Sequence, residues 1–378
     1  MKEIKTVGIV GFGVMGAAIG VNAAMSGYRV VFKELNDELV ESMYDKWVVK
    51  SLNKRVERGK MTQEAMDEVT GMITGSSQYD DLAGCDLVIE AAVEIMDLKI
   101  GIFSDLSSAC PGDTILVSNT STFLIEKLME KVDKQERTAG LHYFFPASVN
   151  KLLEVIRQKN TSDDTYQALI DFAGKCGKVA ISVKDFPGFA INPIFISSYM
   201  VLNSFYGEKY NVATLDDIAK KTLGVKYGIM WVQNGSGMGT AYHGASSMFD
   251  YLGETDIGYP AVPDQLKTQF ENNMLWDLED GPVLEDQAAR DMVRDHLLGS
   301  IFTISTHLIE KKVMVISIDD LDLGICTALA WPKGPFSLMN ELGMEETARL
   351  VKLAVDSKYF KMPQKFAAGD AAPWALGR

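Results

Sequence analysis

A glycine-rich turn after the first apolar run constrains the fold of this chain more than any other feature. Residues 6–10 form a β-type run that ends in Gly11-Phe12-Gly13-Val14-Met15-Gly16. Residues 17–26 are small and helix-compatible, residues 29–32 form a second apolar run, and Glu34 lies just beyond it. A strand, a glycine turn, a helix and a second strand that ends near a carboxylate are the unit that binds a dinucleotide.

The turn residues have separate expected parts. Gly11 permits the tight turn, Gly13 lets a pyrophosphate approach the backbone, and Gly16 allows the helix and the strand to pack closely. The first helical residues, Val14 and Met15, would present free backbone amides to the phosphates. A plain glycine-rich turn is the alternative, but here the flanking strands, the helix and the acidic residue are all present.

Glu34 indicates which dinucleotide the turn binds. A carboxylate at this place bonds the adenosine ribose hydroxyls and repels a 2′-phosphate, which favours NAD over NADP. The neighbouring Lys33 carries the opposite charge and works against this inference.

Apolar runs continue to alternate with helical stretches up to about residue 186. This alternation predicts an α/β Rossmann-type domain with a mostly parallel sheet. Ligands of such sheets bind beyond the carboxyl ends of the strands. Glu94, Asn119 and Ser121 all lie at expected strand ends of this kind.

His142 and Glu154 stand out as a candidate acid/base pair. His142 is one of four histidines, and each of the two residues lies in a short apolar run that reads as a strand. A histidine held by a buried carboxylate, with a hydroxyl donor nearby, is a general acid/base set. A single pair of this kind is more often structural, so its interpretation depends on the surrounding motifs.

Composition narrows the possible partners. With 37 basic against 51 acidic side chains, the net charge is −14, which argues against nucleic acid or an anionic membrane as the main partner. No apolar run reaches the roughly 18 residues of a membrane span, and we expect no signal peptide. The four cysteines are scattered without ligand spacing to histidine, so we expect reduced thiols, no metal and a cytoplasmic location.

A polar stretch at residues 37–67 predicts a long helix with a basic face. Lys46, Lys50, Lys54 and Arg58 recur at four-residue spacing, which places them on one side of a helix. In a chain this acidic, such a stripe suits the phosphates of a nucleotide-like substrate handle. A solvated surface is the alternative.

Five further short motifs follow the glycine turn. They are Val93-Glu94 with Lys99, Ser118-Asn119-Thr120-Ser121, Gly140-Leu141-His142-Tyr143-Phe144, Lys151-Leu152-Leu153-Glu154-Val155-Ile156, and Lys184-Asp185-Phe186-Pro187-Gly188-Phe189-Ala190-Ile191-Asn192. With the glycine turn, this set resembles the 3-hydroxyacyl-CoA dehydrogenase family, in the intervals between motifs as well as in the motifs. The similarity runs from about residue 5 to residue 260 and resumes near residue 290.

The resemblance implies a reaction and a set of site residues. The reaction is the reversible NAD-dependent oxidation of an (S)-3-hydroxyacyl-CoA to the 3-ketoacyl-CoA. The match makes His142 the catalytic base and Glu154 its partner, while Ser121 and Asn192 bond the reacting oxygen. Three more residues are placed at the cofactor and its junction with the substrate, namely Glu94, Lys99 and Asn119.

One position departs from the family pattern. Where the family usually has Asn after His-aromatic-Phe, this chain has Phe145. A large apolar ring in place of an amide suggests a pocket for a branched, cyclic or aromatic acyl group, with Phe145 as a packing wall. The alternative is that Phe145 fills volume behind His142.

Beyond residue 187 the sequence becomes helical. We expect an all-α region with a degenerate internal repeat, because the segment from Ser317 echoes the segment from Thr214, 103 residues earlier. The predicted domains are residues 1–186, a first helical copy at 187–260, a connecting segment at 261–290 and a second copy at 291–378. Tandem copies resemble multifunctional fatty-acid oxidation enzymes of the β-oxidation type, so we expect a monomer with an intrachain pseudo-dimer or a homodimer.

Two alternatives to this function stay open. The chain would be an NAD-dependent dehydrogenase of a free 3-hydroxy acid if the basic stripe has no ligand. It would be a non-catalytic protein that binds NAD and an acyl-CoA if the change at Phe145 removed turnover.

Overall fold

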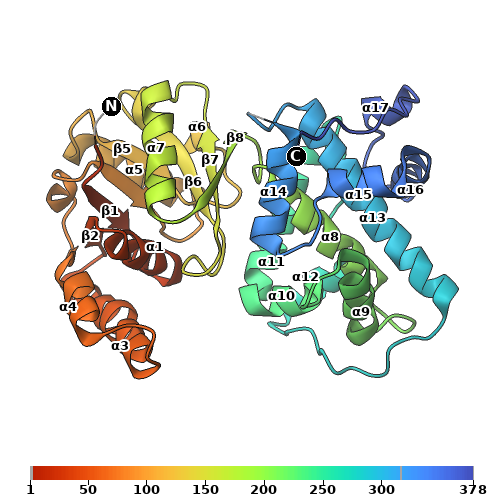
Figure 1. Ribbon diagram of the computed structural model, residues 1–378, viewed down its shortest axis with the longest axis horizontal. Coiled ribbons are helices and arrows are strands. Elements are labelled where there is room, and N and C mark those ends of the chain that lie inside the picture. Colours follow the sequence, from red (N-terminus) through yellow and green to blue (C-terminus); the bar gives the residue numbers. More distant parts are fainter. Residues whose placement is uncertain (1–2, 316, 378) are drawn as a thin grey trace. The chain divides into compact units, whose positions relative to one another are not determined.

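Residues 3–315 and 317–377 are described by a computed structural model that contains two units, Met1–Asp185 and Phe186–Arg378 (Figure 1). The first unit is an α/β domain and the second is helical throughout. The predicted fold class is therefore confirmed. In the part of the chain that the structure describes, no helix is both long enough and apolar enough to cross a membrane.

The first unit is built on one eight-stranded sheet. Its strands are β1 (Thr6–Val10), β2 (Arg29–Lys33), β3 (Ile73–Ser76), β4 (Leu87–Glu90), β5 (Ile115–Ser118), β6 (Thr138–Tyr143), β7 (Leu152–Arg157) and β8 (Val179–Lys184). They lie in the order β3-β2-β1-β4-β5-β6-β7-β8, and every neighbouring pair is parallel except the antiparallel pair of β6 and β7. The carboxyl ends of β1, β4, β5 and β6 thus share one edge of the sheet.

Helices pack on the sheet because its central strands are mostly apolar, with polar residues such as Glu90 and Ser118 at their carboxyl ends. The helices of this unit are α1 (Val14–Met25), α2 (Asp37–Met43), α3 (Lys50–Glu57), α4 (Gln63–Gly71), α5 (Met96–Ala109), α6 (Ile125–Leu128) and α7 (Asp163–Lys175). Figure 1 shows α1 and α7 over one face of the sheet, and their buried side chains share one core with β1 and β6. Every residue of β4 and β5 is buried.

The stretch at residues 37–67 is not the single helix that its charge pattern predicted. It consists of α2, a π-helical turn η1 (Tyr44–Val49), α3 and, after a break, the start of α4. The break comes before Thr62, which caps α4 by accepting a hydrogen bond from the N–H of Ala65. The residues after α4 include the short strand β3.

The second unit contains ten helices among its described residues. They are α8 (Ile191–Phe205), α9 (Val212–Leu223), α10 (Ile229–Ser236), α11 (Met238–Leu252), α12 (Asp264–Glu271), α13 (Gln287–Glu310), α14 (Ile318–Leu329), α15 (Pro335–Leu342), α16 (Met344–Asp356) and α17 (Gln364–Ala367). The two most buried helices, α8 and α13, pack on each other at the centre of the unit.

A pattern of helix capping occurs twice in this unit. Asp216 in α9 accepts hydrogen bonds from two backbone amides at the start of α10, at 2.8 and 3.0 Å. Asp322 in α14 accepts two from the start of α15, at 2.9 and 2.8 Å. Gly228 and Gly334 precede the capped helices, and a Cβ at either would lie within 2.3 Å of the aspartate carboxyl group.

A second pair of contacts has the same spacing. Asn234 bonds both backbone polar groups of Trp276, and Asn340 bonds those of Trp374, at 2.8 to 2.9 Å. Asp216 and Asp322 are 106 residues apart, and so are Asn234 and Asn340. These repeated contacts therefore have a spacing three residues longer than the predicted 103. That the two stretches are copies of one domain stays a prediction.

Candidate active site

His142 and Glu154 lie directly opposite each other across the antiparallel pair β6 and β7. The His142 Nδ1 is 2.6 Å from a carboxylate oxygen of Glu154. His142 is 4% exposed and Glu154 is fully buried, so this polar contact is made away from water. The ring of Phe144 packs against the imidazole, with 4.4 Å between the ring centroids.

The register of the two strands produces this pairing. Side chains of residues directly opposite each other in an antiparallel pair point to the same face of the sheet. Apolar neighbours of His142 and Glu154 fill β6 and β7, and this burial fixes the register in which the pair meets. The pair follows from strand geometry and not from a flexible loop.

Asn119 ties the end of β5 to the strand that carries His142. Its Oδ1 accepts a hydrogen bond of 2.9 Å from the backbone N–H of Tyr143. Its own N–H donates to the carbonyl of Glu90 at 2.8 Å. Asn119 therefore links the carboxyl ends of β4, β5 and β6 next to the histidine.

Glu90 is a site residue that sequence reasoning missed. It is fully buried at the end of β4 and accepts hydrogen bonds from the Lys99 ammonium at 2.6 Å and the Ser118 hydroxyl at 2.5 Å. The signal available in the sequence was a carboxylate that ends an apolar strand with a lysine on the next helix. An acidic residue in such a place needs a cationic partner.

Lys99 and Glu94 extend the same cluster. The Lys99 ammonium also donates to the carbonyl of Ala92 at 3.2 Å and lies 3.2 Å from the Glu94 carboxylate. Glu94 in turn accepts from the Thr120 hydroxyl and from the backbone N–H of Ser121, the latter at 3.1 Å. The cluster thereby fixes the loop that follows β5.

The glycine turn has the geometry of a narrow strand-to-helix connection. Gly11 has φ +85°, which favours glycine. A Cβ on Gly16 would lie 1.9 Å from the carbonyl oxygen of Gly11, whereas the space beside Gly13 is open. Val14 and Met15 lie in the first turn of α1, where the backbone N–H groups have no acceptor within the helix.

Glu34 folds back on this turn. One of its carboxylate oxygens accepts a hydrogen bond of 2.6 Å from the backbone N–H of Phe12. The neighbouring Lys33 is buried, and its ammonium lies 4.3 Å from the centroid of the Tyr79 ring. The positive charge is therefore held in a cation–π contact.

Large apolar side chains are exposed around the same edge of the sheet. Leu35 is 77% exposed after β2, and Val93 and Ile95 are 63% and 56% exposed after β4. Sequence reasoning named Val93 only as part of a motif and did not name Leu35 or Ile95, because only the structure shows that these side chains are exposed. Such side chains suit the flat faces of a bound ring system.

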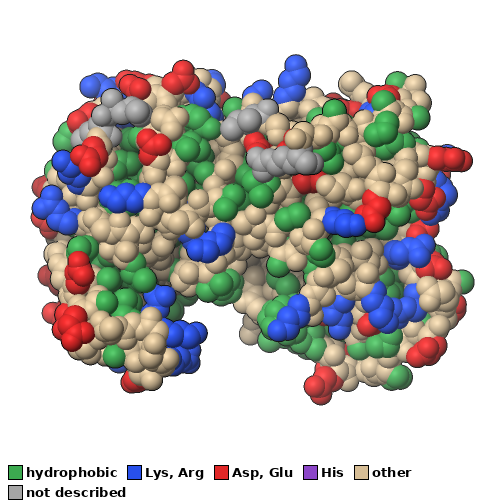
Figure 2. Space-filling view, in the orientation of Figure 1, with side chains coloured by type: hydrophobic (Ala, Val, Ile, Leu, Met, Phe, Trp, Pro, Cys, Tyr) green, Lys and Arg blue, Asp and Glu red, His purple; other side chains and the backbone are tan. Residues whose placement is uncertain are grey.

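The remaining predicted site residues lie on other elements of the chain. Lys46 lies in η1, Lys50 and Lys54 in α3, and all three are exposed. Figure 2 shows Lys and Arg side chains gathered over this part of the first unit. Lys50 pairs with Asp45 at 2.5 Å. Asn192 belongs to the helical unit, in the first turn of α8.

Phe145 is not behind His142. It is 56% exposed in the loop between β6 and β7, and the ring that packs on the imidazole is that of Phe144. The alternative that Phe145 fills volume behind the histidine is therefore wrong. Val149 in the same loop is 70% exposed, so the loop presents two apolar side chains.

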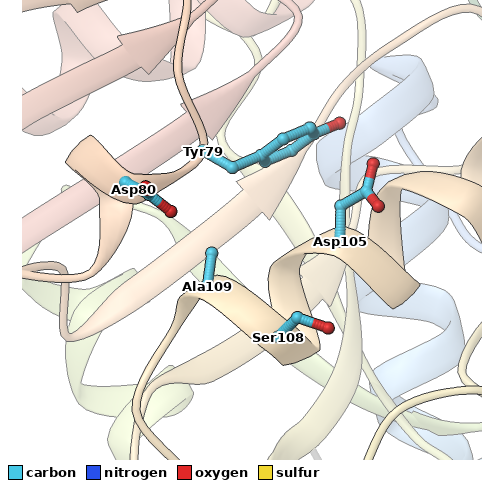
Figure 3. Close-up of a pocket in the computed structure, with 5 residues that line it drawn as sticks. All are labelled: Tyr79, Asp80, Asp105, Ser108 and Ala109. Carbon is cyan, nitrogen blue, oxygen red and sulfur yellow. The ribbon is translucent and has the colours of Figure 1, made fainter.

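A cavity of about 370 Å³ lies apart from these residues, between η2 (Asp80–Leu82) and α5. Tyr79, Asp80, Asp105, Ser108 and Ala109 line it, and the hydroxyl end of Tyr79 lies on the side of Asp105 (Figure 3). Burial, with a smaller contribution from Asp105, raises the pKa of Tyr79 to about 12. None of the predicted site residues lines this cavity. No three His, Cys, Asp or Glu side chains of the described chain form a group that could hold a metal ion.

Comparison with known proteins identifies relatives of both units. Residues 6–186 match the family model described as 3-hydroxyacyl-CoA dehydrogenase, NAD binding domain. The fatty acid oxidation complex subunit alpha of Idiomarina loihiensis is 34% identical over 242 residues, which are 64% of this chain and 34% of that protein. The chain spans about a third of the length of such curated relatives.

Solved structures show the same architecture. The 3-hydroxybutyryl-CoA dehydrogenase of Escherichia coli K12 matches with a TM-score of 0.85 and 20% identity, over 97% of this chain and 98% of that one. At this identity the likeness concerns the fold. The (S)-3-hydroxybutyryl-CoA dehydrogenase of Ralstonia eutropha is 29% identical with a TM-score of 0.67, over 72% of this chain and 95% of that one.

The expected NAD-binding domain is thus confirmed, and the motifs, the family match and the fold agree. Residues 6–186 of this chain belong to the NAD-binding domain of the 3-hydroxyacyl-CoA dehydrogenase family.

Proposed function

We propose that this protein catalyses the reversible NAD-dependent oxidation of an (S)-3-hydroxyacyl-CoA to the 3-ketoacyl-CoA. The observation that carries the proposal is the buried His142–Glu154 pair, which lies in the unit that contains the NAD-binding domain. A base beside a nicotinamide site is what the oxidation of a secondary alcohol requires.

His142 is proposed to take the hydroxyl proton. Because its Nδ1 is bonded to Glu154, Nε2 is the nitrogen that acts as the base. Glu154 orients the ring and stabilises the imidazolium that forms. NAD, when bound, would supply the acceptor for the hydride that leaves the carbon bearing this hydroxyl. Ser121 and Asn192 are assigned to the reacting oxygen, to which both can donate hydrogen bonds.

The glycine turn is proposed to hold the cofactor. Open space beside Gly13 leaves room for a pyrophosphate, and the amides of Val14 and Met15 would bind its oxygens. Glu34 would bond the adenosine ribose. Since the ammonium of Lys33 is held against Tyr79, it does not offset the repulsion of a 2′-phosphate by Glu34, which supports NAD over NADP.

Glu94, Lys99 and Asn119 are assigned to the cofactor side of the site, in different roles. A lysine ammonium has three N–H donors, and those of Lys99 have acceptors in Glu90, Ala92 and Glu94. Lys99 therefore acts by holding Glu94 in place. Asn119 acts by fixing the strand next to His142.

The basic side chains of the first unit are proposed to bind the phosphates of coenzyme A. Lys46, Lys50 and Lys54 are all exposed in a chain of net charge −14. Their replacement by glutamine should raise KM for the thioester, more strongly at low salt, without changing KM for NADH. Equal KM values before and after replacement would assign these lysines to a solvated surface.

The acyl group is proposed to be branched, cyclic or aromatic, because it would meet the exposed ring of Phe145. Phe145→Asn should shift preference toward straight-chain thioesters. An unchanged ranking of substrates would contradict this part of the proposal.

The activity is tested by following NADH absorbance with a panel of 3-ketoacyl-CoA thioesters beside the matching free acids. Turnover of the thioesters supports the proposal, and turnover of the free acids alone supports the alternative dehydrogenase. NADH binding without turnover of either supports a non-catalytic binding protein. His142→Ala should abolish turnover while NADH still binds, with His243→Ala, an exposed histidine of the helical unit, as the control.

We also propose that the two helical stretches are copies that pack as an intrachain pseudo-dimer. The repeated Asp216 and Asp322 caps and the packing of α8 on α13 support this arrangement. Light scattering should then show a monomer, and a homodimer would show that the second copy does not replace a partner. A cytoplasmic location stays a prediction.

A further inference from the structure

Lys178 is a buried lysine with no part in the site described above. The helix α7 ends at Lys175 and is capped by Cys176, Gly177 turns the chain with φ +68°, and Lys178 leads into β8. Lys178 is 9% exposed, and no carboxylate of the described chain forms an ion pair with it. A cation in such surroundings needs other polar partners.

Those partners are backbone carbonyls of one loop. The Lys178 ammonium donates to the carbonyl oxygens of Ala147 at 2.5 Å and of Asn150 at 2.7 Å. Both belong to the segment 144–151, which joins β6 to β7 and therefore joins His142 to Glu154. The lysine fastens this segment from the neighbouring strand β8.

Other hydrogen bonds also hold the segment, because the N–H of Leu152 donates to the Oδ1 of Asn150 at 3.1 Å and the N–H of Val179 donates to the carbonyl of Lys151 at 2.8 Å. The backbone N–H groups of Val149 and Asn150 both donate to the carbonyl of Pro146 at 2.9 Å. Phe144 and Ala147 are buried, whereas Phe145 and Val149 are exposed and do not anchor the segment. The two charge-assisted hydrogen bonds from Lys178 hold the backbone at Ala147 and Asn150, next to these exposed side chains.

The cost of this arrangement is visible in the lysine itself. Burial, with a smaller contribution from Lys151, lowers the pKa of Lys178 to about 8. An apolar side chain of the same length would avoid that desolvation. A lysine here is understandable if its hydrogen bonds to the loop are needed.

We propose that Lys178 is a positioning residue that fixes the segment 144–151 and so sets where the acyl group meets Phe145 and Val149. The identity of the ligand in this inference rests on the proposed function. The hydrogen bonds by which Lys178 holds the loop do not depend on it. Because His142 and Glu154 are held by their strands, loss of the lysine affects substrate affinity more than the chemical step.

The test compares Lys178→Met, which removes the donor, with Lys178→Arg, which keeps a cationic donor, in the full-length protein. Lys175→Met is the control, because Lys175 is exposed on α7 and lies against Tyr28 instead of the loop. Lys178→Leu, which also lacks a donor, replaces the methionine variant if the latter does not fold. The measurements are kcat, KM for acetoacetyl-CoA and for NADH, and hydrogen exchange at the amides of Val149 and Asn150.

We expect Lys178→Met to raise KM for the thioester about tenfold, to change kcat and KM for NADH less than threefold, and to speed exchange at both amides about tenfold. Lys178→Arg should recover most of the affinity. A fall in kcat alone, with KM unchanged, would show a general structural role and overturn the proposal.

The exchange measurement separates this inference from the proposed function. If the wild-type protein turns over no thioester, the proposed function fails, and faster loop exchange in Lys178→Met still supports the fastening. Unchanged exchange at Val149 and Asn150 overturns the fastening whatever the activity.

Discussion

Glu154→Gln tests the central contact of the proposed site with little change in shape. The carboxylate is fully buried and lies 2.6 Å from the His142 Nδ1. Glutamine has the same size and can still accept a hydrogen bond from that nitrogen, so the ring keeps its orientation and loses only the charge beside it.

The expected size follows from the type of hydrogen bond. A bond to a charged partner contributes about 1.5–3 kcal/mol, and most of it is needed only when the imidazolium forms. At about 1.4 kcal/mol for each factor of ten, kcat should fall by about 10- to 150-fold. KM for NADH should not change, because Glu154 is not part of the glycine turn.

The assay is steady-state oxidation of NADH with acetoacetyl-CoA, together with NADH binding followed by its fluorescence. Glu130→Gln is the matched control, since it makes the same change at an exposed position. If Glu154→Gln keeps kcat within twofold of the wild type and folds normally, the pair is structural and His142 does not depend on it as a base.

Three further predictions concern stability. Gly16→Ala should lower the free energy of unfolding by about 1–3 kcal/mol, because its Cβ would meet the Gly11 carbonyl at 1.9 Å, whereas Gly13→Ala, in open space, should fold normally and lose NAD affinity. Asp322→Ala should cost about 1–2 kcal/mol in urea unfolding, since two amides at the start of α15 lose their cap. Burial lowers the pKa of Lys178 from 10.5 to about 8. Above pH 8 the unfolded chain therefore binds more protons than the folded one, so the free energy of unfolding rises with pH. Relative to Lys178→Met, the free energy of unfolding of the wild type should rise by about 2 kcal/mol from pH 8 to 10. A wild-type advantage that shrinks over that range would refute the last prediction.

Much of the first unit could be predicted from local pattern alone. The glycine turn and the apolar runs of β1, β2, β4 and β5 each carry their signal within a few residues. The pairing of His142 with Glu154 was within reach for the same reason, because both belong to short apolar strands. Their direct opposition depends on an antiparallel register that no single segment specifies.

The missed features depend on contacts between distant segments. Glu90 acquires its role from Lys99 on the next helix and Ser118 on the next strand. Lys178 belongs to none of the sequence motifs, and only the structure shows that its ammonium lies beside the loop at Ala147. The π-helical turn at Tyr44–Val49 was not predicted, because the four-residue spacing of Lys46, Lys50 and Lys54 is typical of an α-helix.

In the hairpin of β6 and β7, the strands set the contact between His142 and Glu154, and the connecting loop sets which side chains are exposed. The contact between His142 and Glu154 is set by backbone pairing between the strands, while the exposed loop residues Phe145 and Val149 take no part in that pairing. These exposed residues can therefore be exchanged without moving His142 from Glu154. A chain built this way can acquire a new substrate preference and keep its chemistry.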